Sequence, residues 1–335
     1  METRRLGSLD VSVIGLGCNQ LGTAACDEAT AIAVINEALD NGVNYFDTSD
    51  EYGRNYADAS DLSGWGRSEE ILGKALRSRR DEVIIATKFG PIGDEAIGTG
   101  PGDPLWERSR ASAHGIRVSI EESLQRLGTD RIDLYQIHFP DPLYPIAETL
   151  GALDELVKAG KVREIGCSNF SGEQLAEARS TALELGTSSF VSVQCELNVL
   201  RRGALETVMG ECEASGVAFI PYYPLASGVL TGKYRRGEAP PAGARLTEQL
   251  PDSVRSRILS DRTFARIEAL EAYAVERGHT LLELAFGWLL GHGPVASVIA
   301  GASKPGQVAS NAAAANWRMT PDEVAAVTAL VESLS

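Results

Sequence analysis

The protein has 335 residues, of which 44% are hydrophobic, and a formal net charge of −15 from 46 acidic and 31 basic residues. A chain of this length and apolar content can form one large α/β barrel or two medium-sized domains. The acidic excess argues against a protein that binds nucleic acid or anionic membranes over a broad surface, although a small local basic site for a phosphorylated ligand is compatible with it.

The cysteines and the apolar segments indicate a cytoplasmic protein. The five cysteines are scattered and form no C-x-x-C pair, so we expect reduced thiols and neither a disulfide framework nor a zinc site. Residues 1–5 contain no hydrophobic signal region. The most apolar stretch, Leu281–Leu290, is too short to span a bilayer, so we expect no membrane contact.

A hairpin and a short apolar strand are expected first along the chain. A Gly/Ser/Asp turn between two short segments predicts the hairpin over residues 3–13. The strand Ile14–Leu16 then ends in Gly17, Cys18 and Asn19. Its two glycines also resemble the start of a dinucleotide-binding fingerprint, but the third glycine of that pattern is replaced by Gln20. A doubly wound nucleotide-binding fold is therefore the weaker alternative.

Seven further apolar runs are predicted to be strands, and each ends in polar residues or glycine. The first of them lies in the stretch N-Y-F-D-T-S-D-E-Y-G, residues 44–53. The residues at the seven strand ends are Asp47, Lys88, His138, Ser168-Asn169, Gln194, Tyr222 and Gly301. Short, fully apolar strands separated by helices form a parallel sheet that is covered on its outside. Eight such units favour a (β/α)8 barrel that occupies residues 1–335 as one domain.

Helical spacing of apolar residues predicts a helix after each strand. Ser171-x-x-Gln174 is a capping box that begins one of them. Apolar positions between 205 and 212 predict one continuous helix, and Pro321 is expected to begin the last helix.

Three long segments are expected to be loops at the mouth of the barrel. They are rich in Gly, Pro and polar residues and cover 53–66, 90–106 and 225–260. Such loops shape the binding pocket of a barrel enzyme. Trp65, Trp106 and Tyr144 are candidate apolar walls of that pocket, although aromatic residues in loops often only pack against the barrel rim.

Four of the polar side chains make chemical sense as one catalytic device, namely Asp47, Tyr52, Lys88 and His138. A phenol has a reference pKa of about 10 and is a poor acid near neutrality, but a nearby ammonium favours its phenolate form. Lys88 can supply that ammonium, and Asp47 can supply the counter-charge that a buried ammonium requires. Tyr52 can then donate a proton to a carbonyl oxygen, and His138 can donate a hydrogen bond to the same oxygen.

Simpler interpretations stay open for these residues. Lys88 can simply be the residue at which a strand reaches the solvent, and His138 can be a hydrogen-bonded core histidine. Ser168-Asn169 can simply begin the next helix, and Lys304 can be an ordinary surface charge. The four histidines show no H-x-H or H-E-x-x-H spacing, which argues against zinc.

Short motifs in a fixed order along nearly the whole chain resemble the aldo-keto reductase family, NADPH-dependent reductases on a (β/α)8 barrel. Within that family, the chain resembles the potassium-channel β-subunit-like branch. The motifs are Leu6-Gly7, Ile14-Gly15-Leu16-Gly17, Asp47-Thr48 with Tyr52-Gly53, Gly66-Arg67-Ser68-Glu69, Thr87-Lys88, Gln136 to Asp141, Gly166 to Phe170, Gln194 with Asn198, Pro224-Leu225 with Leu230 to Lys233, and Gly301 with Gln307 and Asn311. Each motif is weak alone, but their order and spacing together are specific.

The resemblance implies a role for each matching residue. It makes Asp47, Tyr52, Lys88 and His138 the catalytic residues, with Tyr52 as the proton donor. It implies cofactor contacts for Gly17, Cys18, Asn19, Asp47, Ser168, Asn169, Gln194, Tyr222, Leu225, Gly228, Lys233, Gly301, Ser303, Lys304, Gln307 and Asn311. Among them, Ser168, Asn169 and Gln194 would hold the nicotinamide carboxamide, and Tyr222 would stack on the ring. The segment 225–233 would follow the pyrophosphate, and the last five residues would hold the 2′-phosphate and adenine.

The chemistry of the last group favours NADPH over NADH. Ser303, Lys304 and the start of the following helix offer donors and positive charge for a phosphate. The chain also departs from the family pattern. Tyr223 stands where a serine hydroxyl is expected near the pyrophosphate, and Ala300 replaces the usual proline before Gly301.

The expected function is reduction of an aldehyde or ketone to an alcohol with NADPH, and the expected partner is a small-molecule carbonyl substrate. One alternative is a non-catalytic NADPH-binding regulatory subunit of a partner protein. Another is a barrel glycosidase, for which only Asp47 and Glu196 are obvious acids near strand ends. The identity of the substrate and the oligomeric state cannot be read from the sequence.

Overall fold

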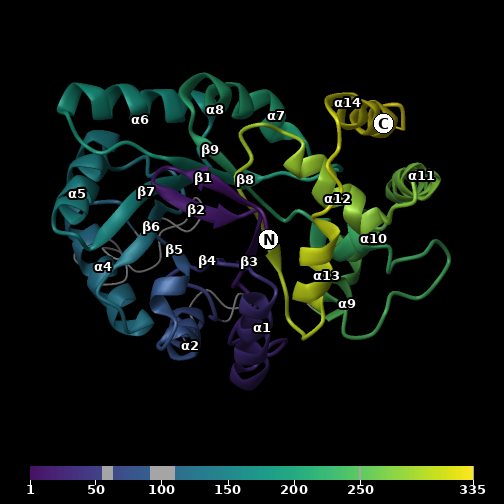
Figure 1. Ribbon diagram of the computed structural model, residues 1–335, viewed down its shortest axis with the longest axis horizontal. Coiled ribbons are helices and arrows are strands. Elements are labelled where there is room, and N and C mark those ends of the chain that lie inside the picture. The colour runs from purple at the N-terminus through teal and green to yellow at the C-terminus, as the bar shows by residue number, and fades with distance from the viewer. Residues whose placement is uncertain (55–62, 91–109, 249, 335) are drawn as a thin grey trace.

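The computed structural model describes residues 1–54, 63–90, 110–248 and 250–334 (Figure 1). Two of the predicted loops, 53–66 and 90–106, therefore fall partly or almost entirely outside the described residues, and Trp106 lies outside them. Within the described part of the chain, no helix combines the length and the apolar composition that a bilayer-spanning segment requires.

Eight parallel strands form the predicted (β/α)8 barrel, which confirms the expected fold. They are β3 (Ile14–Gly17), β4 (Tyr45–Asp47), β5 (Ile84–Phe89), β6 (Ile132–Ile137), β7 (Val162–Ser168), β8 (Ser192–Glu196), β9 (Ala218–Tyr222) and β10 (Val298–Gly301). From β3 to β9 each strand pairs with the next in chain order, and β10 pairs with β3. Two hydrogen bonds of Phe219, to Pro294 at 2.8 Å and from Ala296 at 3.1 Å, nearly close the ring.

The two glycines of β3 serve packing inside this barrel and not a dinucleotide fingerprint. A Cβ on Gly15 would lie 2.5 Å from the Tyr45 ring, and a Cβ on Gly17 would lie 2.8 Å from Ile299. Contacts this short require glycine, because real Cβ atoms do not approach so closely. The doubly wound alternative is therefore wrong.

A hairpin covers the N-terminal end of the barrel. It consists of β1 (Thr3–Leu6) and β2 (Leu9–Ser12), and it lies across the strands in Figure 1. Its buried residues Leu6, Leu9 and Val11 belong to the apolar cluster that fills the barrel interior, where Tyr45, Ile84 and Leu134 also lie. Apolar packing therefore plugs this end and leaves the opposite mouth for polar side chains.

Helices surround the barrel (Figure 1). They are α1 (Glu28–Asp40), α2 (Arg67–Leu76), η1 (Arg80–Glu82), α4 (Ala113–Leu127), α5 (Ile146–Lys158), α6 (Gly172–Leu185), α7 (Gly203–Thr207), α8 (Met209–Ser215), η2 (Ala226–Thr231), α9 (Arg245–Glu248), α10 (Asp252–Ile258), α11 (Asp261–Glu276), α12 (Leu281–Leu290), α13 (Gln307–Ala314) and α14 (Pro321–Glu332). The predicted capping box is present, because Ser171 and Gln174 exchange side-chain and backbone hydrogen bonds.

Two predictions about the connections are wrong. The helix expected through residues 205–212 is broken at Val208, whose φ of −131° and ψ of −40° are not helical. The segment 225–260 is not a plain loop, since it contains η2, α9 and α10. Buried Val229, Leu230 and Leu246 anchor its first part. Such short helices carry too few turns for a periodic pattern to reveal them.

The strand register brings the predicted polar ends to one mouth. Gly17 pairs with both Asp47 and Gly301, and Ser168 pairs with Gln194. Lys88 pairs with Gln136. Because parallel neighbours run in the same direction, all these carboxyl ends lie on the same side of the barrel, which is where barrel enzymes carry their active sites.

Candidate active site

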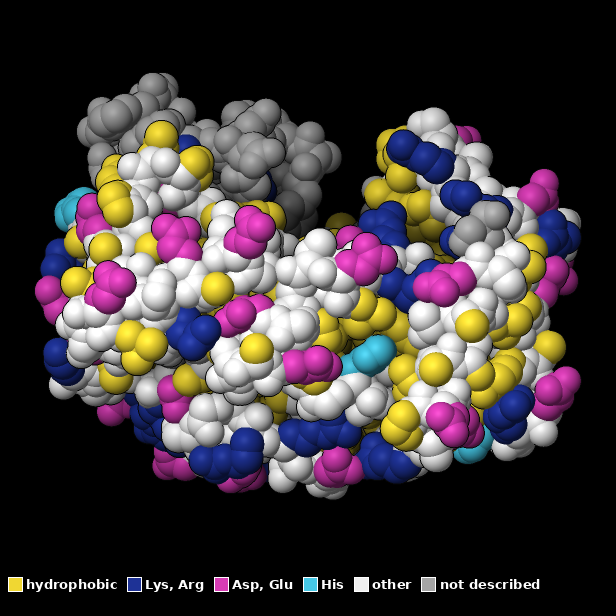
Figure 2. Space-filling model, turned by 90° about the horizontal axis from the view of Figure 1, so that it is seen from above, with side chains coloured by type: hydrophobic (Ala, Val, Ile, Leu, Met, Phe, Trp, Pro, Cys, Tyr) yellow, Lys and Arg dark blue, Asp and Glu magenta, His cyan; other side chains and the backbone are white. Residues whose placement is uncertain are grey.

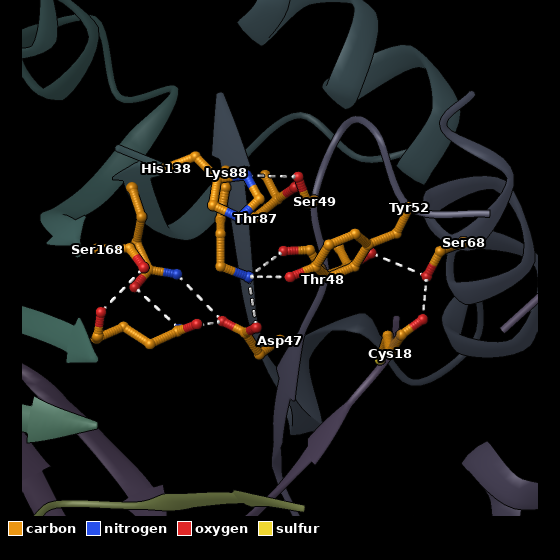
Figure 3. Close-up of polar contacts among 12 residues, drawn as sticks. Cys18, Asp47, Thr48, Ser49, Tyr52, Ser68, Thr87, Lys88, His138 and Ser168 are labelled. Atoms are coloured by element: carbon orange, nitrogen blue, oxygen red, sulfur yellow. Dashed lines mark hydrogen bonds and ion pairs between the residues drawn. The ribbon is translucent and has the colours of Figure 1, made fainter. Parts of the chain in front are cut away.

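A fully buried lysine is the centre of the polar cluster at the mouth. Lys88 lies in β5 and has an exposed fraction of 0%. Its Nζ donates to Asp47 Oδ1 at 2.5 Å, to the Thr48 carbonyl at 2.8 Å and to the Tyr52 hydroxyl at 3.3 Å (Figure 3). A buried ammonium is tolerated when a counter-charge and further acceptors satisfy its protons. Here the three acceptors come from β4 and the turn after it.

The carboxylate of Asp47 is held on both oxygens. Its Oδ2 accepts from the side-chain amides of Gln136 at 3.1 Å and of Gln194 at 2.8 Å, while Oδ1 accepts from Lys88. No role for Gln136 is predicted from the sequence, because a linear motif does not show which strand residues point inward. The two amides fix the carboxylate in the orientation that pairs it with the ammonium.

Tyr52 lies over this ion pair because the turn after β4 is tied to α2. Its backbone N–H donates to the Ser49 carbonyl at 3.2 Å, and its carbonyl accepts from the Ser68 N–H at 3.1 Å. The next residue, Gly53, has a φ of +102°, and a Cβ there would lie 2.6 Å from Arg67. Both facts demand glycine. The result places Lys88 Nζ 4.8 Å from the centre of the Tyr52 ring.

His138 faces Tyr52 from the end of β6. The ring centres are 6.0 Å apart at an interplanar angle of 75°. Burial, then the cations Lys88 and Arg54, hold the pKa of His138 well below its ordinary value. The imidazole is therefore neutral near pH 7, and a neutral imidazole carries one N–H that can donate a hydrogen bond.

A second hydrogen-bonded group adjoins His138. Asn169 has a left-handed φ of 62°, and its side-chain amide donates to the His138 carbonyl at 3.0 Å and to Ser168 Oγ at 3.1 Å. Tyr222 donates to Asn169 Oδ1 at 2.8 Å, and Ser168 donates to the Gln194 carbonyl at 2.9 Å. Burial raises the pKa of Tyr222, so its phenol stays neutral.

The remaining predicted residues gather at the ends of β3 and β10 and on the segment after β9. Gly17 pairs with Gly301, and the side-chain oxygen of Asn19 lies 3.8 Å from the position that a Cβ on Gly301 would take. Cys18 is buried. Leu225 and Gly228 are half-buried, and Lys233 Nζ lies over Gly228, 2.7 Å from where a Cβ would stand.

Two lysine side chains of this region are near enough for their charges to repel each other. Desolvation, then the charge of Lys304, lower the pKa of Lys233. No carboxylate of the described residues forms an ion pair with either lysine. Figure 2 shows a raised region on the right of the view, whose flank carries dark blue Lys and Arg side chains beside a hollow. Two like charges without a counter-charge favour binding of an anion between them.

The N-terminal turn of α13 is already hydrogen-bonded. Ser303 and Lys304 donate their backbone N–H groups to Gln307 Oε1 at 2.8 and 3.1 Å. Gly306 donates to both carboxylate oxygens of Glu37 at 2.8 and 2.9 Å. Asn311 is buried on the same helix. An acidic group thus occupies part of the helix end that an anion would prefer.

The two carboxyls that a glycosidase would use are both engaged in other contacts. Asp47 is fully engaged by Lys88 and two amides, and Glu196 pairs with Arg201 at 3.0 Å. Neither carboxyl is free to act as a glycosidase acid. Among the residues that the structure describes, no group of three or more His, Cys, Asp or Glu side chains can hold a metal ion.

The aromatic residues proposed as pocket walls are placed in part. The ring of Trp65 lies 5.9 Å from the Arg54 guanidinium, on the segment between Tyr52 and α2. Tyr144 lies half-buried in the turn before α5. Trp65 therefore lies close to the turn that carries Tyr52 and Arg54.

Comparison with known proteins gives a consistent result. The sequence profile described as "Aldo/keto reductase family" matches residues 13–332. The aldo-keto reductase YhdN of Bacillus subtilis is 32% identical and aligns over 97% of this chain and 91% of its own length. A probable voltage-gated potassium channel subunit beta of Oryza sativa is also 32% identical, over 99% and 97%. Among solved structures, the glycerol dehydrogenase AKR11B4 of Gluconobacter oxydans superposes with a TM-score of 0.79 at 28% identity, covering 99% of this chain and 95% of that one.

Proposed function

Because the chain belongs to the aldo/keto reductase family, we propose that it is an NADPH-dependent enzyme that reduces an aldehyde or ketone to an alcohol. The observation that carries this proposal is the contact of the buried Lys88 ammonium with both Asp47 and the Tyr52 hydroxyl. This arrangement is what a phenol requires in order to act as a proton donor at neutral pH.

Tyr52 donates the proton that the reduced carbonyl oxygen receives. Its hydroxyl accepts a hydrogen bond from Lys88 at 3.3 Å and can pass its own proton to the substrate. As that proton leaves, the phenolate that forms lies beside a positive charge. Asp47 holds the Lys88 side chain in place, so the two residues act through Tyr52.

His138 orients the substrate oxygen and stabilises the charge that develops on it. A neutral imidazole in a buried site donates an N–H without releasing a proton, which suits a hydrogen-bond donor better than an acid. Its low pKa, caused by burial and by Lys88 and Arg54, keeps it in this form over the physiological range. Tyr52 and His138 would therefore contact the same oxygen from two sides.

A nicotinamide cofactor, when bound, would supply the hydride. The donors and acceptors of Ser168, Asn169 and Gln194 suit its carboxamide, and the half-buried ring of Tyr222 offers an aromatic face. The paired ammoniums of Lys233 and Lys304 support NADPH over NADH, because the additional phosphate brings negative charge to an uncompensated positive site. We propose that the other residues named above at the ends of β3 and β10 line the rest of this cleft.

The test is NADPH oxidation measured over a panel of aldehydes and ketones, followed by NADP reduction with polyols that include glycerol. Polyols are included because a structural relative is a glycerol dehydrogenase. We expect turnover on at least one carbonyl compound and a preference for NADPH over NADH. The absence of turnover in either direction on every compound would refute the proposal.

A non-catalytic regulatory subunit is the second candidate, since one relative is described as a potassium channel subunit beta. The assembled contacts of Asp47, Tyr52, Lys88 and His138 weigh against it. The two functions differ in a simple measurement. A regulatory subunit would bind NADPH tightly in a fluorescence titration and show no oxidation of it with any carbonyl compound.

A further inference from the structure

Ser49 connects His138 to a buried carboxyl group that has no role in the reaction described above. Ser49 Oγ donates to Asp50 Oδ1 at 3.2 Å, the direction that an ionised carboxyl requires, and it lies 3.4 Å from His138 Nδ1. Figure 3 shows the hydroxyl directed toward the imidazole. The exposed fractions are 0% for Ser49, 3% for Asp50 and 8% for His138. A serine hydroxyl has one proton and two lone pairs, so it can accept from one neighbour and donate to the other.

Acidic groups from several elements face Asp50. Burial, then Glu69 of α2, raise the pKa of Asp50 to about 8, against the opposing charge of Arg126 from α4. Glu51 adds a smaller effect in the same direction as Glu69. The Tyr135 phenol of β6 also faces this carboxyl, and burial keeps that phenol neutral by raising its pKa.

Glu69 itself is a fixed neighbour that does not compete for the Ser49 proton. Its Oε1 accepts from Thr87 at 2.6 Å and its Oε2 accepts from Arg126 at 2.6 Å. Asp50 therefore carries a proton near neutral pH and offers an O–H donor, and Ser49 is the side chain whose hydroxyl lies within hydrogen-bond distance of it.

The Nδ1 atom of His138 has a second neighbour of opposite character. Glu51 Oε1 lies 3.8 Å from Nδ1, while Glu51 Oε2 accepts from Arg54 at 2.9 Å. The cations Lys88 and Arg54 and the Tyr52 ring face the same imidazole. The Ser49 hydroxyl can donate a hydrogen bond to Nδ1. The Glu51 carboxyl, when ionised, can only favour a proton on Nδ1. The hydroxyl is the closer of the two.

We propose that Asp50 and Ser49 are positioning residues that determine which nitrogen of His138 carries its proton, and the proposal rests on the reductase function given above. While Asp50 is protonated, the hydrogen bond between it and Ser49 is reversed, so that Asp50 donates to Ser49 and Ser49 donates to Nδ1. The proton of the neutral imidazole then lies on Nε2, the nitrogen that remains to donate to the substrate oxygen.

Loss of the Asp50 proton reverses this arrangement. The Ser49 hydroxyl turns to the carboxylate, because a hydrogen bond to a charged acceptor is stronger than one to a neutral nitrogen. Nδ1 then faces only acceptors, and the imidazole proton moves from Nε2 to Nδ1. One proton has passed from Asp50 to solvent and His138 is still neutral, but Nε2 no longer donates. Carbonyl reduction is therefore expected to decline as pH rises through about 8.

The test compares the pH profile of kcat, from pH 6 to 10 at saturating substrates, in the wild type and three variants. Asp50→Asn keeps an N–H donor toward Ser49 at every pH, so the decline near pH 8 disappears. Ser49→Ala breaks the chain, so kcat falls roughly 10-fold and the same decline disappears. The double variant behaves like Ser49→Ala. If Asp50→Asn keeps the wild-type decline, the proposal is overturned.

A second readout does not depend on turnover. NMR of the protein labelled with ¹⁵N-histidine, with the His138 signals assigned from a His138→Gln variant, reports the tautomer directly. We expect the Nε2–H form at pH 7, a change to the Nδ1–H form by pH 9.5, and no change in Asp50→Asn. A wild type without reductase activity that still shows this tautomer change would refute the proposed function and leave the relay intact. The same tautomer at both pH values would refute the relay. Glu51→Gln is the matched control. If the pH-dependent tautomer change of His138 is lost in Glu51→Gln and not in Asp50→Asn, Glu51 controls the tautomer and the proposal is contradicted.

Discussion

The two ends of the barrel mouth differ in how their charges are balanced. At the catalytic end, Lys88 is fully buried and is compensated by Asp47, which is itself held by two amides. At the end formed by β10 and the segment after β9, the charges of Lys233 and Lys304 repel each other, and none of the described carboxylates forms an ion pair with them. The cation at the first end is paired with a carboxylate, whereas the two cations at the second end have no ion-paired carboxylate among the described residues.

This difference indicates which part of the function each end performs. A compensated, rigid cluster keeps its geometry whether or not a ligand is present, which suits proton transfer. An uncompensated pair of cations gains free energy only when an anion arrives, which suits recognition of a phosphate. Substitutions at the catalytic end should therefore affect both stability and turnover, whereas substitutions at the phosphate end should affect binding alone.

The largest effect is expected from Lys88→Met. Removing the ammonium leaves the Asp47 carboxylate buried without a counter-charge, which costs about 3–5 kcal/mol of unfolding free energy. Urea denaturation measures this loss, and NADPH oxidation should cease. The double variant Lys88→Met with Asp47→Asn removes both charges and should regain most of the stability but none of the activity. Equal stability of the two variants would show that the ion pair is not the reason for the loss.

A pH-dependent loss of stability is expected from Asp50, at the same end. Its pKa of about 8 in the folded protein lies above the ordinary value of 3.8, so the folded state binds a proton that the unfolded state releases between these values. The contribution is fully present below about pH 4 and is lost as pH rises through 8. Asp50→Asn should therefore reduce the loss of unfolding free energy between pH 5 and pH 9 by on the order of 2–4 kcal/mol. Denaturation of the wild type and of Asp50→Asn at each pH measures this difference. An equal loss of unfolding free energy in both proteins would argue against a raised pKa of Asp50.

A smaller and purely binding effect is expected from Lys304→Ala. Loss of one charge–phosphate contact should weaken NADPH binding roughly 10- to 100-fold and leave NADH binding unchanged, as fluorescence titrations can show. Removal of one of two repelling cations should not lower the melting temperature. Lys304→Arg keeps the charge and serves as the control. Equal weakening for both cofactors would mean that this lysine does not recognise the additional phosphate.

The sequence predicted the barrel because each strand is a short apolar run that ends in a polar residue. It did not reveal the break at Val208 or the short helices between 225 and 260, because a helix of one or two turns leaves little periodicity. It also gave no role to Gln136, Ser49 or Asp50. The roles of Gln136 and Ser49 arise from contacts with residues 89 positions away, namely Asp47 and His138, and Asp50 acts through its neighbour Ser49. Placement of 1–335 in one domain stays a prediction.

The most direct test of the catalytic end is Tyr52→Phe, measured for kcat in carbonyl reduction and for NADPH affinity in the same preparation. The ring and its packing are retained, and only the hydroxyl 3.3 Å from Lys88 Nζ is removed. If Tyr52 donates the proton, kcat falls roughly 100-fold or more while the NADPH dissociation constant stays within a factor of about 3. A variant that keeps the wild-type kcat would show that the proton comes from another group.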